Sequence, residues 1–206
     1  MTMAFHYAKQ QLHIEDLPLA DIAHRVGTPV YCYSHGQIEA NYKAFETALG
    51  KALPSTPFTI CYACKAGSNI AILRILQKLG AGADIVSGGE LARAEKAEIA
   101  PQKIVFSGVG KMDTEIEQAL KKNILQLNAE SMPELENLST IAGKLGVKAR
   151  VALRVNPGIE AATHSKISTG KIENKFGIDI LDVPEIYGRA AKLPNIEMTG
   201  LSLHIG

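Results

Sequence analysis

The 206-residue sequence predicts an α/β protein with the architecture of a (β/α)8 TIM barrel. Short apolar runs alternate with helical patterns, mostly at a period of about 21 to 24 residues, which is typical of parallel β/α units. No G-x-G-x-x-G or G-x-x-x-x-G-K-[ST] turn follows these runs, so the phosphate-binding turns of open doubly wound sheets are missing. Polar residues close almost every run, at the end where barrel enzymes carry their chemistry. A closed barrel is therefore favoured over an open sheet.

The apolar runs locate six expected strands, which begin at Thr59, Gly82, Lys103, Ile124, Lys148 and Met198. The polar residues that close them are Lys65, Asp84 with Ser87, Ser107, Asn128, Arg154 with Asn156, and His204. A TIM barrel has eight strands, so we expect the barrel to be truncated after about the sixth. The wide gap before the last run holds a polar, glycine-punctuated stretch over residues 156–180. Long loops of this kind are usually functional or disordered, and its place after a strand end favours function.

Helix start and stop signals separate the strands. Ser87 with Glu90 and Ser131 with Glu134 fit the capping box, in which a hydroxyl and a carboxylate satisfy the first backbone amides of a helix. The other signals are Asp113 and Asp182 before expected helices at 114–121 and 183–192, Pro184 in a first turn, and Gly80 and Gly146 after helix ends.

The residues before the first barrel strand form a separate region. Residues 17–26 and 34–49 show helical patterns, with Ser34 before the second one, and 28–34 are expected to form a short strand between them. We expect this region to be an appendage of the barrel or part of a second domain.

Composition and charge exclude several classes of protein. The chain has 22 basic and 21 acidic residues, a net charge of +1, so it lacks the basic excess of a nucleic-acid-binding protein. No apolar run approaches the ~20 residues that span a bilayer, and no signal peptide is apparent. The three cysteines cannot form a disulfide framework. We therefore expect a cytoplasmic globular protein that binds neither nucleic acid nor membrane.

Lys65 carries the sharpest chemical signal. It ends the apolar run FTICYAC and precedes the tight turn Ala66-Gly67-Ser68. A lysine enclosed by apolar walls loses solvation of its charged form, its pKa falls, and its amine becomes a nucleophile that can form a Schiff base with an aldehyde such as pyridoxal phosphate. The alternative is a lysine that extends from a strand end into solvent.

Other candidates are expected on the same rim. His204 is either a functional ring or a structural histidine, and Asp84 either orients Lys65 or caps a helix. Arg154 either binds a carboxylate or phosphate bidentately or forms a rim salt bridge. Cys61 and Cys64 form a C-x-x-C within a strand and lack a second ligand pair, so we interpret them as buried apolar residues and expect no metal site.

Several segments together resemble the pyridoxal-phosphate-dependent decarboxylases with an alanine-racemase-like barrel. YACKAG is similar to their Y-A-x-K-A-N lysine motif, with Gly67 in place of the usual asparagine. GADIVSGGEL, RVNPGIEAATHSKISTGKIENKFGI and GLSLHIG follow in the order found in the diaminopimelate-specific branch. The resemblance spans the chain from about Gly27 onward. It implies a lyase that converts meso-2,6-diaminopimelate into L-lysine and carbon dioxide, in the last step of lysine biosynthesis.

The resemblance also implies residue roles and partners. Lys65 would hold pyridoxal 5'-phosphate, His204 would stack on its ring, and Asp84 would lie beside both, with Arg154 as a further expected cofactor-binding residue. Lys175 would lie near a partner subunit, because members of the family are homodimers with shared active sites. The proton donor is a cysteine from a motif that none of the three cysteines here occupies.

The resemblance implies a domain division as well. Residues 1–28 would belong to or pack on a β-domain, and 29–206 would form an incomplete cofactor-binding barrel. The C-terminal β-domain, the glycine-rich phosphate loop and an E-P-G-R segment would lie outside this chain. We therefore expect the fragment alone to be inactive.

Two alternatives stay open. The chain could decarboxylate a related basic amino acid, namely ornithine, arginine, lysine or carboxynorspermidine. It could also be a non-catalytic barrel homologue that binds cofactor or protein partners. An alanine racemase is set aside, because KAGSNIAIL differs from the turn that follows the lysine in those enzymes.

Overall fold

The structure is a computed structural model that describes residues 4–158 and 176–204. Its N-terminal part is a small antiparallel sheet of β1 (Phe5–Ala8), β2 (Gln11–Ile14) and β3 (Leu17–Pro18), followed by α1 (Leu19–Val26). Lys9 and Gln10 form the two-residue turn between β1 and β2, both with positive φ. The sequence did not predict this sheet, because its strands have only two to four residues and are too short for an alternating pattern to stand out.

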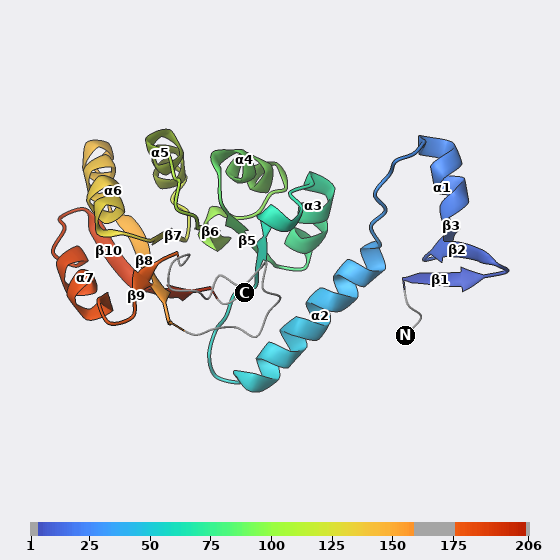
Figure 1. Ribbon diagram of the computed structural model, residues 1–206, viewed down its shortest axis with the longest axis horizontal. Coiled ribbons are helices and arrows are strands. Elements are labelled where there is room, and N and C mark those ends of the chain that lie inside the picture. The colour runs from blue at the N-terminus through green and yellow to red at the C-terminus, as the bar shows by residue number, and fades with distance from the viewer. Residues whose placement is uncertain (1–3, 159–175, 205–206) are drawn as a thin grey trace.

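The helix α2 (His35–Ala52) follows, and it runs between the N-terminal sheet and the rest of the chain (Figure 1). The predicted cap is confirmed, since the Ser34 hydroxyl accepts a hydrogen bond from the Gln37 amide at 2.9 Å. Glu15 secures the N-terminal sheet here, because its Oε1 accepts from the Ser34 hydroxyl at 2.6 Å and from the Gly36 amide at 2.8 Å. The expected strand at 28–34 is wrong: these residues have no strand partner among the described residues.

The main sheet confirms the predicted α/β class with parallel strands. Its strands are β4 (Cys61–Ala63), β5 (Gly82–Ile85), β6 (Ile104–Phe106), β7 (Gln126–Ala129), β8 (Ala149–Asn156) and β10 (Ile196–Leu203), paired in that order. All of these pairs are parallel. The short β9 (Ile178–Asp179) pairs only with the end of β8. Every predicted apolar run overlaps one of the six main strands.

Five helices cover one face of this sheet (Figure 1). They are α3 (Ile70–Lys78), α4 (Gly88–Lys96), α5 (Asp113–Lys121), α6 (Met132–Leu145) and α7 (Val183–Ala190). Short 3-10 turns, η1 (Cys64–Ala66) and η2 (Pro101–Lys103), follow β4 and precede β6. The core lies between sheet and helices, where Leu73, Ile85, Phe106 and Leu153 are fully buried. The opposite face, with alternate strand residues, is left to carry polar groups.

The helix caps largely follow the sequence. Ser87 accepts from the Glu90 amide at 3.2 Å and Ser131 from the Glu134 amide at 3.3 Å, as the capping box predicts. The two carboxylates bind one residue further back than in that motif, at the backbone amides of Val86 and Glu130, both at 2.8 Å. Gly146 ends α6 in the left-handed conformation, as predicted.

Two predicted caps are wrong. Asp113 is the first residue of α5, and the carboxylate of Glu115 accepts from the Met112 amide instead, at 3.0 Å. Asp182 does precede α7, but its side chain makes no capping hydrogen bond, because its backbone is already helical. Pro184 lies in the first turn of that helix, as predicted.

Candidate active site

A pocket of about 570 Å³ opens at the carboxyl ends of the parallel strands, away from the helices. The strand-end polar residues that line it are Lys65, Asp84, Ser107, Asn128, Arg154 and His204. The structure therefore brings together all four residues that the sequence assigned to the cofactor. Ser87 and Asn156 are outside the lining. Ser87 caps α4, and the Asn156 side chain accepts from the Gly158 amide at 3.0 Å.

Lys65 lies in the 3-10 turn η1, immediately after β4. The turn is closed by a hydrogen bond from the Gly67 amide to the Cys64 carbonyl at 3.0 Å, and the Tyr62 hydroxyl donates to the Gly67 carbonyl at 3.3 Å. The lysine itself is exposed, so the expectation of a lysine enclosed by apolar walls is wrong. The reason is its position past the end of β4, an outer strand of the sheet that pairs only with β5 among the described residues.

Asp84 lies on β5 and faces the pocket, and the sequence left open whether it orients Lys65 or caps a helix. None of the ion pairs found in the described ranges joins the two. Asp84 Oδ1 instead accepts from the Ser107 hydroxyl at 2.7 Å. Ser107 Oγ in turn accepts from Asn128 Nδ2 at 3.0 Å. Asp84 is therefore held by the neighbouring strands and not by the lysine.

Arg154 forms a salt bridge, one of the two roles expected for it, but the pair is buried, and the sequence did not identify its partner, Glu130. Arg154 Nη1 lies 2.6 Å from Glu130 Oε1, and the side chains are only 15% and 4% exposed. The guanidinium also lies over the ring of Phe176, 5.6 Å from its centroid. Glu130 Oε2 is buried without a hydrogen-bond partner in the described part of the chain. The available signal was a charged residue directly after the buried end of β7.

His204 follows β10 and contributes its ring to the same pocket. The pKa of its imidazole is held below the ordinary value, first because of partial burial and then because of the nearby cations Lys65 and Arg154. The ring is accordingly neutral at pH 7. A neutral ring can lie against a flat ligand without adding a further positive charge to the pocket.

A second lysine near the rim, Lys111, is excluded as the nucleophile by its contacts. Its Nζ donates to the carbonyls of Gly108 at 2.6 Å and Asn128 at 2.7 Å, and to Glu134 at 2.8 Å. The side chain is 1% exposed, and all three donor hydrogens are used. Among the described residues that line the pocket, Lys65 is the only lysine.

The C-x-x-C cysteines are thiols and not thiolates. Burial raises the pKa of Cys61 to about 11 and that of Cys64 to about 12. Cys64 is fully buried, as predicted, whereas Cys61 is half-buried and its thiol donates to the Lys103 carbonyl at 3.6 Å. Within residues 4–158 and 176–204, no cluster of three or more potential ligands could hold a metal ion.

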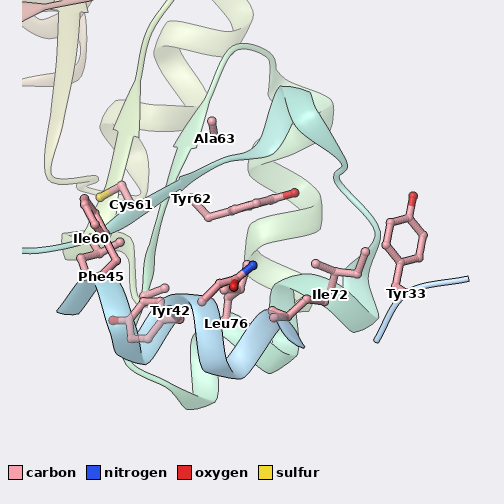
Figure 2. A pocket seen from close by; sticks show the side chains of 12 residues that line it. Tyr33, Tyr42, Phe45, Ile60, Cys61, Tyr62, Ala63, Ile72 and Leu76 are labelled. Atoms are coloured by element: carbon pink, nitrogen blue, oxygen red, sulfur yellow. The ribbon is translucent and has the colours of Figure 1, made fainter. Parts of the chain in front are cut away.

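A second pocket, of about 400 Å³, lies between α2, α3 and β4 (Figure 2). Figure 2 shows Tyr42 and Phe45 of α2 facing Ile60 and Leu76, so the walls are almost wholly apolar. Burial raises the pKa values of three of its titratable groups, Tyr42, Tyr62 and Cys61. Of these two pockets, the larger and more polar one is therefore the candidate active site.

Parallel β/α units that bring an amine, a carboxylate, a guanidinium and an imidazole into one pocket at the carboxyl ends of their strands are typical of the barrel domains of enzymes. The chain belongs to the pyridoxal-dependent decarboxylases, and residues 35–206 match the pyridoxal binding domain of that family. Of the segment RVNPGIEAATHSKISTGKIENKFGI, which carries part of the resemblance, residues 159–175 lie outside the described residues.

Relatives and solved structures agree with this assignment. The chain is 48% identical over 204 residues to diaminopimelate decarboxylase of Pseudomonas fluorescens, covering 98% of this chain and 48% of the relative. It is 47% identical to that of Vibrio cholerae, with the same coverage. The crystal structure of diaminopimelate decarboxylase from M. jannaschii in complex with L-lysine matches 98% of this chain and 48% of its own, with a TM-score of 0.90 at 37% identity. The chain thus spans about half the length of the relatives it matches.

Proposed function

We propose that the protein carrying this chain uses pyridoxal 5'-phosphate to decarboxylate meso-2,6-diaminopimelate to L-lysine and carbon dioxide. The observation that carries the proposal is the position of Lys65 in a pocket that also contains Asp84, Arg154 and His204. The choice of substrate is supported by the relatives of 46–48% identity, which are diaminopimelate decarboxylases matched over 97–98% of this chain.

The residues present fit this cofactor. A volume of about 570 Å³ is in the usual range of small-molecule sites. The pocket offers a primary amine for the aldehyde, a guanidinium for an anionic group and a neutral ring for a flat face. When bound, pyridoxal phosphate supplies an electrophilic carbonyl carbon and a ring that delocalises the electron pair left when carbon dioxide departs.

The chain's own residues would divide the work as follows. Lys65 Nζ would hold the cofactor covalently and release it to the substrate amine. Asp84 would face the cationic side of the bound molecule, and Arg154 would bind an anionic group, since Glu130 keeps its guanidinium in place at 2.6 Å. His204, neutral at pH 7, would support the ring by stacking and not by proton transfer.

The wider assignments belong to the same proposal. We place the protein in the cytoplasm as a homodimer with shared active sites, in which Lys175 lies near the partner subunit. The cytoplasm is supported by three free cysteines. No helix of residues 4–158 and 176–204 is long and apolar enough to cross a membrane. Residues 1–28 are assigned to a second, β-containing domain and 29–206 to the cofactor-binding barrel, with support from the compact N-terminal sheet that ends before Gly27.

Reductive labelling tests the proposal directly. Full-length protein is incubated with pyridoxal phosphate, reduced with borohydride and digested, and the pyridoxyl group is located by mass spectrometry. We expect the label on Lys65 and its loss in Lys65→Arg, because a guanidinium stays protonated and cannot condense with an aldehyde. A label on Lys111 or Lys175 in its place would refute the assignment.

The substrate is tested by carbon dioxide release from meso-diaminopimelate, ornithine, lysine and arginine at equal concentrations. We expect turnover of meso-diaminopimelate to dominate. Preference for another amino acid in this panel would correct the substrate while leaving the cofactor chemistry intact. Absence of labelling and of turnover would instead indicate a non-catalytic homologue.

A further inference from the structure

Three strands of the sheet are joined by a chain of side-chain hydrogen bonds along the pocket. Gln126 Nε2 donates to Asn128 Oδ1 at 2.9 Å, and Asn128 Nδ2 donates to Ser107 Oγ at 3.0 Å. The Ser107 hydroxyl then donates to Asp84 Oδ1 at 2.7 Å. This chain of hydrogen bonds runs from β7, past the end of β6, to β5, and all four residues line the pocket that contains Lys65.

The direction of these bonds is fixed by the chemistry at their end. An ionised carboxylate only accepts, so Ser107 must give its single hydrogen to Asp84. The lone pair that remains on Ser107 accepts from the amide nitrogen of Asn128, which leaves the amide oxygen of Asn128 to accept from Gln126. Every donor therefore points toward Asp84, and such a chain strengthens the last bond because each link polarises the next.

Asn128 is held firmly enough to transmit this orientation. It is 5% exposed, and its backbone carbonyl accepts from Lys111 Nζ at 2.7 Å. The hydrogen-bond chain occupies Asp84 Oδ1 and holds the carboxyl group in one rotamer. The other carboxylate oxygen has no hydrogen bond or ion pair among the described residues, and Asp84 faces the pocket.

We propose that Ser107 and Asn128 are positioning residues that hold the Asp84 carboxylate in one orientation, aimed at the cofactor. This inference rests on the proposed function, since it gives Asp84 a ligand to meet. Neither residue needs to touch that ligand to have its effect. Ser107 acts through one hydrogen bond to a charged group, and Asn128 acts by fixing the direction in which Ser107 donates.

The test compares variants of the full-length protein that remove, reverse or restore the chain. Ser107→Ala removes the donor to Asp84, and Ser107→Thr keeps it. Asn128→Asp is nearly isosteric but cannot donate to Ser107, so the serine hydroxyl is shared between two carboxylates. Ser139→Ala is the matched control, because Ser139 is equally buried, 5% exposed, but lies on α6 away from the pocket.

The main readout is the dissociation constant for pyridoxal phosphate, titrated into apoprotein and followed by the visible absorption of the bound cofactor. We expect it to rise about tenfold or more in Ser107→Ala and Asn128→Asp, which is the size of one hydrogen bond to a charged group. Ser107→Thr should stay near the wild-type value, and so should Ser139→Ala. Thermal unfolding of the apoproteins, measured in parallel, should differ little between Ser107→Ala and Ser139→Ala.

The outcomes separate the inference from the proposed function. Wild-type affinity in Ser107→Ala and Asn128→Asp would overturn the positioning role and leave the proposed function standing. Weaker binding that tracks a lowered unfolding temperature, with no rescue in Ser107→Thr, would also overturn it in favour of a purely structural network. Failure of the wild-type protein to bind pyridoxal phosphate would refute the proposed function, and the positioning role with it.

Discussion

Replacing Arg154 by methionine should destabilise the fold strongly, because it leaves the Glu130 carboxylate buried without its cation. The two groups are 2.6 Å apart, and the Glu130 side chain is 4% exposed. Methionine fills much of the arginine volume but donates no hydrogen bond. Both carboxylate oxygens of Glu130 would then lack a donor among the described residues, since Oε2 lacks one already.

The expected loss is about 3–5 kcal/mol of unfolding free energy, the usual cost of removing one partner of a buried pair. Glu130→Gln added to Arg154→Met removes the stranded charge and leaves only a neutral amide without a partner, which costs about 1–3 kcal/mol. The double variant should therefore be about 2 kcal/mol more stable than Arg154→Met alone. The total stability of a domain is only about 5–15 kcal/mol, so these differences are large.

Urea unfolding of the full-length protein, followed by circular dichroism, measures these free energies. The control is Arg189→Met, because the pair of Arg189 with Glu185 on α7 is 3.6 Å long with side chains 53% and 76% exposed. An exposed pair contributes little, so the control should change stability by no more than about 0.5 kcal/mol. A loss below about 1 kcal/mol in Arg154→Met, or a double variant no more stable than the single one, would refute the reasoning.

Two further predictions concern packing and charge. Gly82→Ala should lower the unfolding free energy by at least about 1–3 kcal/mol, because the added Cβ would lie 2.1 Å from the Lys103 carbonyl oxygen. The control Gly188→Ala, whose added Cβ would have no atom within 4 Å, should be neutral or stabilising. An unchanged urea midpoint in Gly82→Ala would contradict the expected clash. His204 should titrate below pH 6.5 in NMR spectra, and Arg154→Met should move its midpoint upward. Because the fold favours the neutral ring, His204 leaves the unfolding free energy unchanged well above pH 6.5. As the pH falls from there through the depressed pKa, His204 lowers the unfolding free energy. An NMR titration midpoint of His204 at or above pH 6.5 would show that the cations and burial do not act as described.

The sequence by itself determined the periodic part of this protein. The apolar runs identified six parallel strands, and Ser87, Ser131 and Gly146 marked helix ends, because these signals depend on residues within a few positions of each other. Polar residues at successive strand ends also predicted one shared site, since the carboxyl ends of parallel strands meet at the same edge.

Only the tertiary structure decided which of these polar groups interact. The sequence left open whether Asp84 orients Lys65 or caps a helix, but Asp84 is bound by Ser107, and Glu130 was not identified as the partner of Arg154. These contacts join residues more than 20 positions apart, and they depend on strand register and side-chain rotamer, which no local pattern encodes. The N-terminal sheet was missed for a related reason. Strands of two to four residues are stabilised by pairing with each other, and they are too short for a sequence pattern to identify them.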